Sequence, residues 1–180
     1  MNKQQIQKLT RMAMLTAVAV VLAALVHFPL FPAASFLEYD PADAVILIAA
    51  FLYGPWDGVL VTVVVSIIQG TTVSAGSGVI GIIMHILATS SFCLVSGYLY
   101  KKNHTTVGLA LSLVLGALAM ALVMVGCNLV FTPLYTGMPM SEVAKMIPGI
   151  ILPFNLLKAG INAAVTFLLY PPLKKALEKF

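Results

Sequence analysis

Charged side chains are scarce in this chain, and their scarcity excludes most classes of soluble protein. Only 9% of the 180 residues are Asp, Glu, Lys or Arg, while 61% are hydrophobic. A soluble domain carries roughly 25% charged residues, and each membrane-spanning helix needs about 20 apolar ones. The alternating segments of a transmembrane β-barrel are also missing. We therefore expect an all-α integral membrane protein, with residues 1–180 forming a single transmembrane domain.

Cysteines and nucleotide-binding motifs are equally poorly represented. Cys93 and Cys127 lie in apolar runs, which indicates buried packing residues and neither a disulfide framework nor a metal site. The chain has no Gly-x-x-x-x-Gly-Lys-Ser/Thr loop for ATP and no evident internal repeat. No series of acidic residues crosses the apolar segments to relay protons. These absences favour a binding subunit of a larger assembly over an enzyme, with no metal and no cofactor.

The basic residues give a net charge of +4, but their distribution argues against nucleic acid as a partner. Basic residues concentrate in the cytoplasmic loops of membrane proteins, where they fix the orientation of the chain. Eight of the ten lie at the two ends and in one short internal segment: Lys3, Lys8, Arg11, Lys101, Lys102, Lys174, Lys175 and Lys179.

Apolar runs predict the spans, at residues 11–28, 42–53, 59–69, 79–100, 107–131 and 150–173. The segment Gly54-Pro55-Trp56-Asp57-Gly58 makes the second and third ambiguous. They form either one kinked helix, giving five spans, or two short helices, giving six. Only six spans place eight of the ten basic residues on one face. We therefore expect a six-transmembrane-helix bundle in the cell membrane, with N- and C-termini cytoplasmic.

This topology places the loops 29–40, 70–78 and 132–149 outside, and polar residues gather near them. Glu38, Asp40 and Asp43 lie by the first loop, and Asn155 and Lys158 lie near the external end of the last span. The sequence thus predicts a polar pocket that opens to the outside.

Lys158 is the most informative of these polar residues. A charge at the bilayer centre costs roughly 2.5–3.5 kcal/mol, so it usually has a polar partner or a function. Asn155 precedes it by three residues and Asn162 follows it by four, so the three share one side of a helix. A cation between two amides suits a ligand rich in carbonyl oxygens. The alternatives are that Lys158 extends its amine to the outer interface, and that Asn162 only joins two helices.

Aromatic and amide side chains accompany Lys158 at the same mouth. Phe36, Tyr39 and Tyr135 belong to the outer loops, and Asn128 lies one turn before the outer end of its span. Together they suit a flat heteroaromatic ligand, whose faces stack on rings and whose polar edge meets amides. The alternatives are interfacial aromatic anchors and an interhelical hydrogen bond from Asn128.

His85 and the alanines of the first span each leave two interpretations open. His85 is either a packing residue or a catalytic group of a small membrane enzyme acting on lipid, which would use His85 or the Asp40 and Asp43 pair. The sequence offers no convincing nucleophile or second metal ligand for such an enzyme. Alanines spaced by four let helices approach closely, either within the bundle or against another subunit. Ala13, Ala17 and Ala24 share one face of this span, and Ala19 and Ala23 share another.

Four segments taken in order resemble a known family, the substrate-capture (S) subunits of energy-coupling-factor vitamin importers, and in particular its riboflavin-specific branch. They are residues 36–43 (FLEYDPAD), 50–58 (AFLYGPWDG), 128–135 (NLVFTPLY) and 151–158 (ILPFNLLK). The likeness extends over nearly the whole chain. One departure is that Ala44 follows Asp43 where relatives often have proline.

The resemblance implies a six-helix subunit that binds riboflavin from outside as a transported ligand, with another vitamin as the alternative. It implies docking through an alanine motif onto a transmembrane coupling subunit that carries two ATPases. The family's flavin-contacting residues correspond to Asn128, Asn155 and Lys158, and its docking motif to Ala13 and Ala17, although Ala19 and Ala23 also fit. The expected substrate-binding set is Phe36, Tyr39, Asp40, Asn128, Tyr135, Asn155, Lys158 and Asn162.

Overall fold

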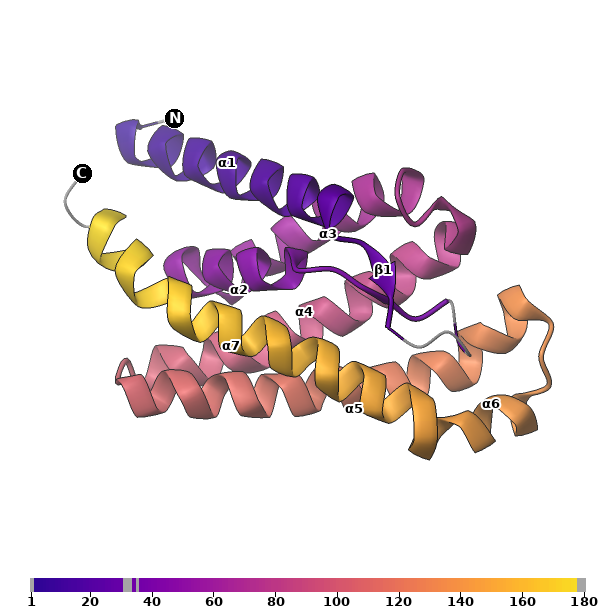
Figure 1. Cartoon of the computed structure of the whole chain (residues 1–180). Helices are drawn as coiled ribbons and strands as arrows, with labels where there is room; N and C mark the ends of the chain where they lie inside the picture. The colour runs from indigo at the N-terminus through magenta and orange to yellow at the C-terminus, as the bar shows by residue number, and fades with distance from the viewer. Residues whose placement is uncertain (1, 31–33, 35, 178–180) are drawn as a thin grey trace.

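The computed structural model describes residues 2–30, 34 and 36–177, and nearly all of these residues are helical (Figure 1). The long and short α-helices are α1 (Lys3–Leu25), α2 (Ala42–Tyr53), α3 (Pro55–Thr71), α4 (Gly78–Lys102), α5 (Thr106–Thr136), α6 (Met140–Met146) and α7 (Leu152–Leu177). Between them lie a 3-10 turn, η2 (Ala75–Ser77), a π-helical turn, η3 (Ile147–Ile151), and two short strands, β1 (Phe28–Pro29) and β2 (Glu38–Tyr39). The structure is therefore all-α apart from one two-residue strand pair.

Helix α1 begins two turns before the apolar run that predicts it. Asn2 caps its first turn: the Asn2 side chain accepts from the Gln5 amide at 2.9 Å, and the Gln5 side chain accepts from the Asn2 amide at 3.0 Å. This reciprocal capping box satisfies backbone donors that the helix leaves unpaired. Of the described residues of α1, only Met12, Ala19 and Ala23 are buried, so the helix lies at the edge of the bundle.

Helices α2 and α3 are separate elements that meet at Gly54 and Pro55, in the segment that the sequence leaves ambiguous. Gly54 ends α2 with a φ of 128°, a conformation that side chains rarely adopt, and Pro55 begins α3. Helix α2 is buried without interruption from Ala42 to Ala50 and contacts α1, α3, α4 and α7. A helix that is apolar on every side belongs in the interior, and α2 is the central helix of this bundle.

The segment 132–149 is mostly helical, so the prediction of a long loop there was wrong. Helix α5 continues through Pro133 to Thr136 and ends at Gly137, whose φ of 73° is left-handed. Pro139 then caps α6, and Pro148 lies in the π-helical turn η3. Because proline lacks an amide hydrogen, it is tolerated in a first turn or where the backbone ladder is already irregular. The prolines therefore mark junctions between helices.

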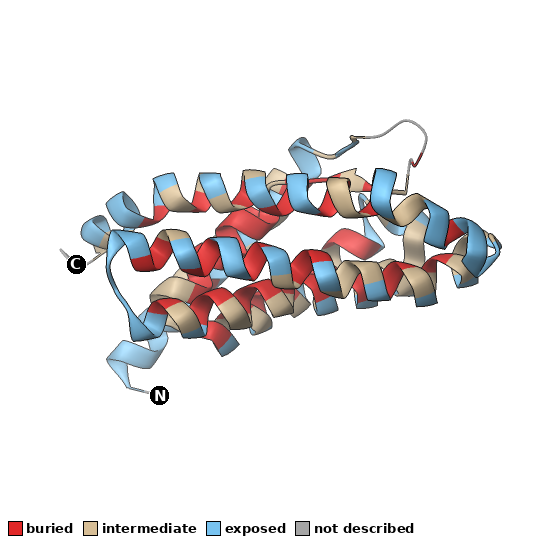
Figure 2. Ribbon diagram, turned by 90° about the horizontal axis from the view of Figure 1, so that it is seen from below, coloured by how far each residue is buried: buried red, intermediate tan, exposed pale blue. Residues whose placement is uncertain are grey.

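Exposed positions alternate with buried ones along the long helices, as Figure 2 shows, and many of the exposed side chains are large and apolar. Leu111, Leu115, Leu118 and Leu122 of α5 are examples. Within the part of the chain that the structure describes, four helical segments are long and apolar enough to cross a membrane, and α2 and α3 are shorter apolar helices. A continuous apolar exterior of this kind is not stable in water. The architecture is that of an integral membrane protein.

The two ends of the bundle differ in charge. In Figure 1 the two termini and the turn between α4 and α5 lie at one end, whereas the strand pair and α6 lie toward the other. The first end carries Lys8, Arg11, Lys101, Lys102 and Lys174. The charge segregation seen in the sequence thus becomes a basic end in three dimensions.

Candidate functional site

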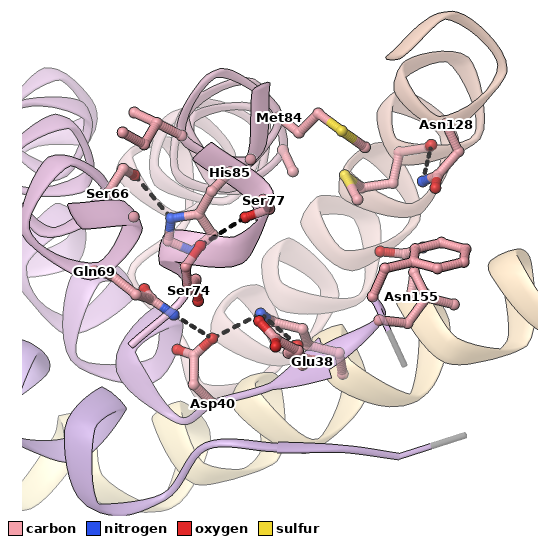
Figure 3. Close-up of a pocket in the computed structure, with 18 of the residues that line it drawn as sticks. Glu38, Asp40, Ser66, Gln69, Ser74, Ser77, Met84, His85, Asn128 and Asn155 are labelled. Carbon is pink, nitrogen blue, oxygen red and sulfur yellow. Dashed lines mark hydrogen bonds and ion pairs between the residues drawn. The ribbon is translucent and has the colours of Figure 1, made fainter. Parts of the chain in front are cut away.

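A cavity of about 110 Å³ lies in the half of the bundle away from the termini. Its wall combines the segment around β2 with residues of α3, η2, α4, α5 and α7 (Figure 3). The lining residues used below are Phe36, Glu38, Asp40, Ser66, Gln69, Ser74, Ser77, Met84, His85, Met120, Met124, Asn128, Tyr135, Asn155 and Lys158. The structure therefore brings polar groups from six segments to one concave site.

Asp40 is the centre of the polar network at the base of this cavity. Its Oδ2 atom lies 2.8 Å from Lys158 Nζ and accepts from Gln69 Nε2 at 3.1 Å. Its Oδ1 atom accepts from the Ala42 amide at 3.0 Å, at the start of α2. The carboxylate is 1% exposed. One buried side chain thus connects α2, α3 and α7.

The environment of Asp40 favours its charged form. Burial alone would raise the pKa of the Asp40 carboxyl, but the Lys158 ammonium, with His85 and the hydrogen bonds from Lys158 and Gln69, outweighs burial and lowers that pKa well below its usual range. Lys158 is also buried, so removing either partner leaves an uncompensated charge inside the protein. The pair is a fixed ionic element of the site.

The side chain of Lys158 points inward, so its alternative role as an interfacial lysine is wrong. Lys158 Nζ also donates to the Glu38 carbonyl at 3.3 Å. An ammonium group has three donors, and the described residues use two of them. The third hydrogen remains for a ligand in the cavity.

Two further residues of the same face hold α7 against the start of α2. Asn162 Nδ2 donates to the Asp40 carbonyl at 3.2 Å, and Thr166 donates to the Ala44 carbonyl at 3.3 Å. Both side chains are fully buried. Asn162 therefore joins two helices, in agreement with the structural interpretation of its position.

Asn155 differs from Asn162 because it lines the cavity, although the Oδ1 atom of each amide is buried without a hydrogen-bond partner among the described residues. Its Nδ2 donates to the Ile151 carbonyl at 2.8 Å, while its buried Oδ1 has no hydrogen-bond partner among the described residues. A buried acceptor without a donor costs free energy, so such atoms usually meet a ligand or water. The Asn155 carbonyl oxygen is thus available to a donor in the cavity.

Asn128 lines the cavity from α5, on the same side of the view in Figure 3 as Asn155. Its Nδ2 donates to the Met124 carbonyl at 2.8 Å, and its Oδ1 accepts from Thr132 at 2.9 Å. These bonds lie within one helix, so the proposed interhelical bond is absent among the described residues. One amide hydrogen of Asn128 is left for a ligand.

The aromatic residues separate into two groups. Phe36 and Tyr135 line the cavity and meet edge to face, with ring centroids 6.1 Å apart. Tyr39 instead packs against Phe28 of β1, with centroids 5.6 Å apart. Alternate residues of a strand point to opposite sides, and this places Tyr39 away from the cavity wall.

The other end of the cavity is rich in hydroxyl groups, and sequence reasoning missed it. Ser66 Oγ lies 2.7 Å from His85 Nδ1, and His85 Nε2 lies 3.2 Å from Asp43 Oδ1. Ser74 and Ser77 of the outer segment 70–78 complete this side. The uncharged Gly/Ser/Thr composition of this segment was the available signal for a polar wall. Its position next to the cavity follows only from the fold.

The row of Ser66, His85 and Asp43 has the residue types of a hydrolase triad but not its arrangement. Ser66 is 1% exposed and also donates to the Thr62 carbonyl at 2.7 Å. Asp43 in addition accepts from Thr89 at 2.8 Å. A nucleophile needs a free approach to its substrate and a base that takes its proton, whereas this hydroxyl is enclosed and bonded within its own helix. The row is a packing and binding element.

Six of the eight residues expected at the substrate site line the cavity: Phe36, Asp40, Asn128, Tyr135, Asn155 and Lys158. Tyr39 and Asn162 lie outside its wall. The two alanine pairs of α1 also separate, since Ala13 and Ala17 are exposed whereas Ala19 and Ala23 are buried in the core. Only the first pair is open to a partner.

Comparison with known proteins gives consistent results along the chain. Residues 7–170 match the family described as ECF transporter, substrate-specific component. The chain is 31% identical to the riboflavin transporter FmnP of Bacillus subtilis (strain 168), over 97% of this chain and 96% of that protein. It is 32% identical to the riboflavin transporter RibU of Streptococcus thermophilus, over 96% of this chain and 85% of that protein.

A solved structure agrees with these relatives. The S component of a bacterial ECF transporter superposes with a TM-score of 0.82 at 29% identity, over 96% of this chain and 98% of that chain. This family is a transporter component and not an enzyme, as expected from the motifs that the sequence lacks. The chain belongs to the family of substrate-specific components of ECF transporters.

Proposed function

We propose that this chain captures riboflavin on the side of the membrane opposite its termini, as the substrate-specific component of an ECF-type transporter. Two of its relatives over nearly the full length are riboflavin transporters. The observation that carries the proposal on the structural side is the unpaired Asn155 oxygen beside an available Lys158 hydrogen in one cavity.

Riboflavin presents the complementary pattern. Its isoalloxazine ring has a uracil-like edge on which carbonyl oxygens flank an imide N–H. Asn155 Oδ1 accepts from that N–H, and Lys158 Nζ and Asn128 Nδ2 donate to the carbonyls. The Phe36 and Tyr135 rings pack on the apolar part of the tricycle.

The hydroxyl-rich end of the cavity suits the polyhydroxylated ribityl chain. Ser74, Ser77, Gln69 and His85 offer donors and acceptors there. The intervening wall contains Met84, Met120 and Met124, whose flexible thioether side chains adapt to a ligand larger than the empty cavity. Riboflavin is in this proposal the transported substrate and not a cofactor.

We also propose the membrane topology. Helices α2 and α3 each cross the membrane, in opposite directions, which gives six spans. Both termini then lie in the cytoplasm. Residues 1–180 form one substrate-binding domain in the cell membrane. The basic residues at the end with the termini support this orientation, because positive charge concentrates on the cytoplasmic side. The cavity then opens toward the outside.

The proposed partners are a transmembrane coupling subunit and two ATPases of an energy-coupling module. Helix α1 is the proposed docking element, because it lies at the edge of the bundle and exposes Ala13 and Ala17. Small side chains at this spacing allow close approach of a second helix.

The decisive experiment is a flavin titration of the protein purified in detergent. We expect a yellow protein that quenches added riboflavin fluorescence, and weaker binding of lumiflavin, which keeps the tricycle but lacks the ribityl chain. Thiamine and biotin serve as competitors from the same class of transported compound. A colourless protein that does not quench riboflavin fluorescence, but does bind another vitamin, would reassign the ligand.

A further inference from the structure

The short length of α2 creates a second cavity at the basic end of the bundle. Twelve residues span about 18 Å, whereas the 23 residues of α1 and the 26 of α7 span about 35 and 39 Å. In Figure 1 both α1 and α7 extend beyond the end of α2 on the side of the termini. A notch is therefore left beneath Tyr53, the last residue of α2.

This notch is a cavity of about 350 Å³ with basic and aromatic walls. Arg11 comes from α1, His104 from the turn between α4 and α5, and Lys174 from the last turn of α7. No Asp or Glu is among the described residues that line it. Asp57, an acid at this end of α3, is paired with Lys8 at 2.8 Å. The charge of the cavity is thus uncompensated by the described residues.

The floor of the notch is rigid and aromatic. Phe51, Tyr100 and Tyr170 pack on one another with ring centroids 5.1 to 5.5 Å apart. The Tyr53 hydroxyl is buried beside Arg11. A guanidinium group can only donate to the hydroxyl oxygen, so the hydroxyl hydrogen remains as a donor in a site that already carries cations.

We propose that this notch binds the phosphate of an anionic phospholipid headgroup, held by Arg11 and Lys174 with Tyr53 and His104 at its edge. Two fixed cations exceed the partial negative charge of about half a unit at the C-terminus of α2. Basic pockets between membrane helices on the cytoplasmic side bind headgroups in this way. A headgroup in this notch belongs to the bilayer leaflet on the side of the termini. The proposal therefore rests on the membrane orientation given under the proposed function, but it does not depend on riboflavin being the substrate.

The first test is native mass spectrometry of the protein purified from bacterial membranes in mild detergent, counting retained phospholipid per chain. The double variant Arg11→Gln/Lys174→Gln is compared with Lys101→Gln/Lys102→Gln, which removes the same charge from exposed positions at the same end. We expect retention to fall at least about tenfold in the first variant and to change less than about twofold in the second. Equal loss in both variants, or in neither, overturns the proposal.

The second test separates a lipid from a free phosphate. The unfolding temperature of delipidated protein is measured with dioleoylphosphatidylglycerol, with dioleoylphosphatidylcholine and with inorganic phosphate. We expect the largest rise with the anionic lipid, in the wild type and in the lysine control only. A rise with inorganic phosphate alone assigns the notch to a soluble anion and overturns the lipid proposal.

Two controls keep the result interpretable. Circular dichroism reports folding of each variant, and the single variants Arg11→Gln and Lys174→Gln replace the double variant if it does not fold. If both single variants retain as much phospholipid as the wild type, the proposed site is wrong. Riboflavin quenching is measured in parallel and is expected to stay unchanged in every variant, so failure of the flavin proposal is seen separately in the wild type.

Discussion

Lys158 Nζ lies 2.8 Å from Asp40 Oδ2, although 118 residues separate the two in the sequence. The contact joins the N-terminal half of α7 to the segment that leads into α2. The same carboxylate accepts from Gln69 of α3, and the same ammonium donates to the Glu38 carbonyl of β2. A single ion pair thus positions the wall of the cavity and still leaves one Lys158 hydrogen for the substrate.

Asp40→Asn is expected to destabilise the protein by about 3–5 kcal/mol, because it leaves the Lys158 charge buried without its partner. Chemical or thermal unfolding in detergent measures this loss. Glu142→Gln provides the control, since its pair with Lys145 is exposed and contributes about 0–1 kcal/mol. The double variant Asp40→Asn/Lys158→Met is expected to recover stability but not flavin affinity. If both stability and flavin affinity recovered, Lys158 would not be a binding residue.

Asn155→Ala is expected to lower riboflavin affinity by about tenfold, because the imide N–H of the ligand loses its acceptor. Fluorescence quenching gives the dissociation constant. Asn162→Ala removes the same amide from the same face of α7 but outside the cavity, so it is expected to lower the unfolding temperature and leave affinity within about threefold. The reverse result would transfer the binding role to Asn162.

Lys158→Ala is expected to weaken riboflavin binding about ten- to a hundredfold, since a charged hydrogen bond in a buried site contributes about 1.5–3 kcal/mol. Tyr39→Phe is the comparison, because the sequence predicted Tyr39 as a binding residue but the structure places it outside the cavity wall. The riboflavin affinity of this variant is expected to stay near that of the wild type. A large loss in Tyr39→Phe would show that the bound state brings this hydroxyl to the ligand.

Ala13→Phe and Ala17→Phe are expected to abolish riboflavin uptake by cells while flavin binding by the purified chain stays intact. Both positions are exposed on α1, and a large ring there prevents close approach of another helix. Ala19→Phe and Ala23→Phe place the same ring in the core and are expected to reduce folding yield. Leu122→Phe, on the exposed face of α5, controls for ring size. Normal uptake in both Ala13 and Ala17 variants would move the docking surface elsewhere.

The proposed orientation predicts which positions an impermeant thiol reagent reaches in intact cells. In a chain whose Cys93 and Cys127 are replaced by Ala, Ala75→Cys is expected to react and Asn103→Cys is not. Both positions are exposed, so access to the reagent decides the result. Labelling at position 103 and not at position 75 would show that the chain has the opposite orientation.

Four features of the protein could be predicted without a structure: the membrane class, the helix around Lys158, the break at Gly54 and the basic end. These follow from hydropathy, turn chemistry and charge, which act within one segment of chain. The sequence also placed Asn155, Lys158 and Asn162 on one face of α7, because helical spacing alone fixes which residues share a side. The helical structure of residues 132–149 escaped the prediction, because proline and glycine mark helix junctions as well as loops.

The contacts that each of these side chains makes could not be predicted without the packed bundle. Helical spacing does not distinguish Asn155 from Asn162, because one meets the cavity and the other meets the Asp40 carbonyl on α2's side of the bundle. It does not distinguish the two alanine pairs of α1 either. Such differences depend on how helices distant in sequence pack, since burial and partners are properties of the assembled bundle. The pairing of Lys158 with Asp40 and the notch beneath Tyr53 exist only because the short helix α2 packs among longer neighbours.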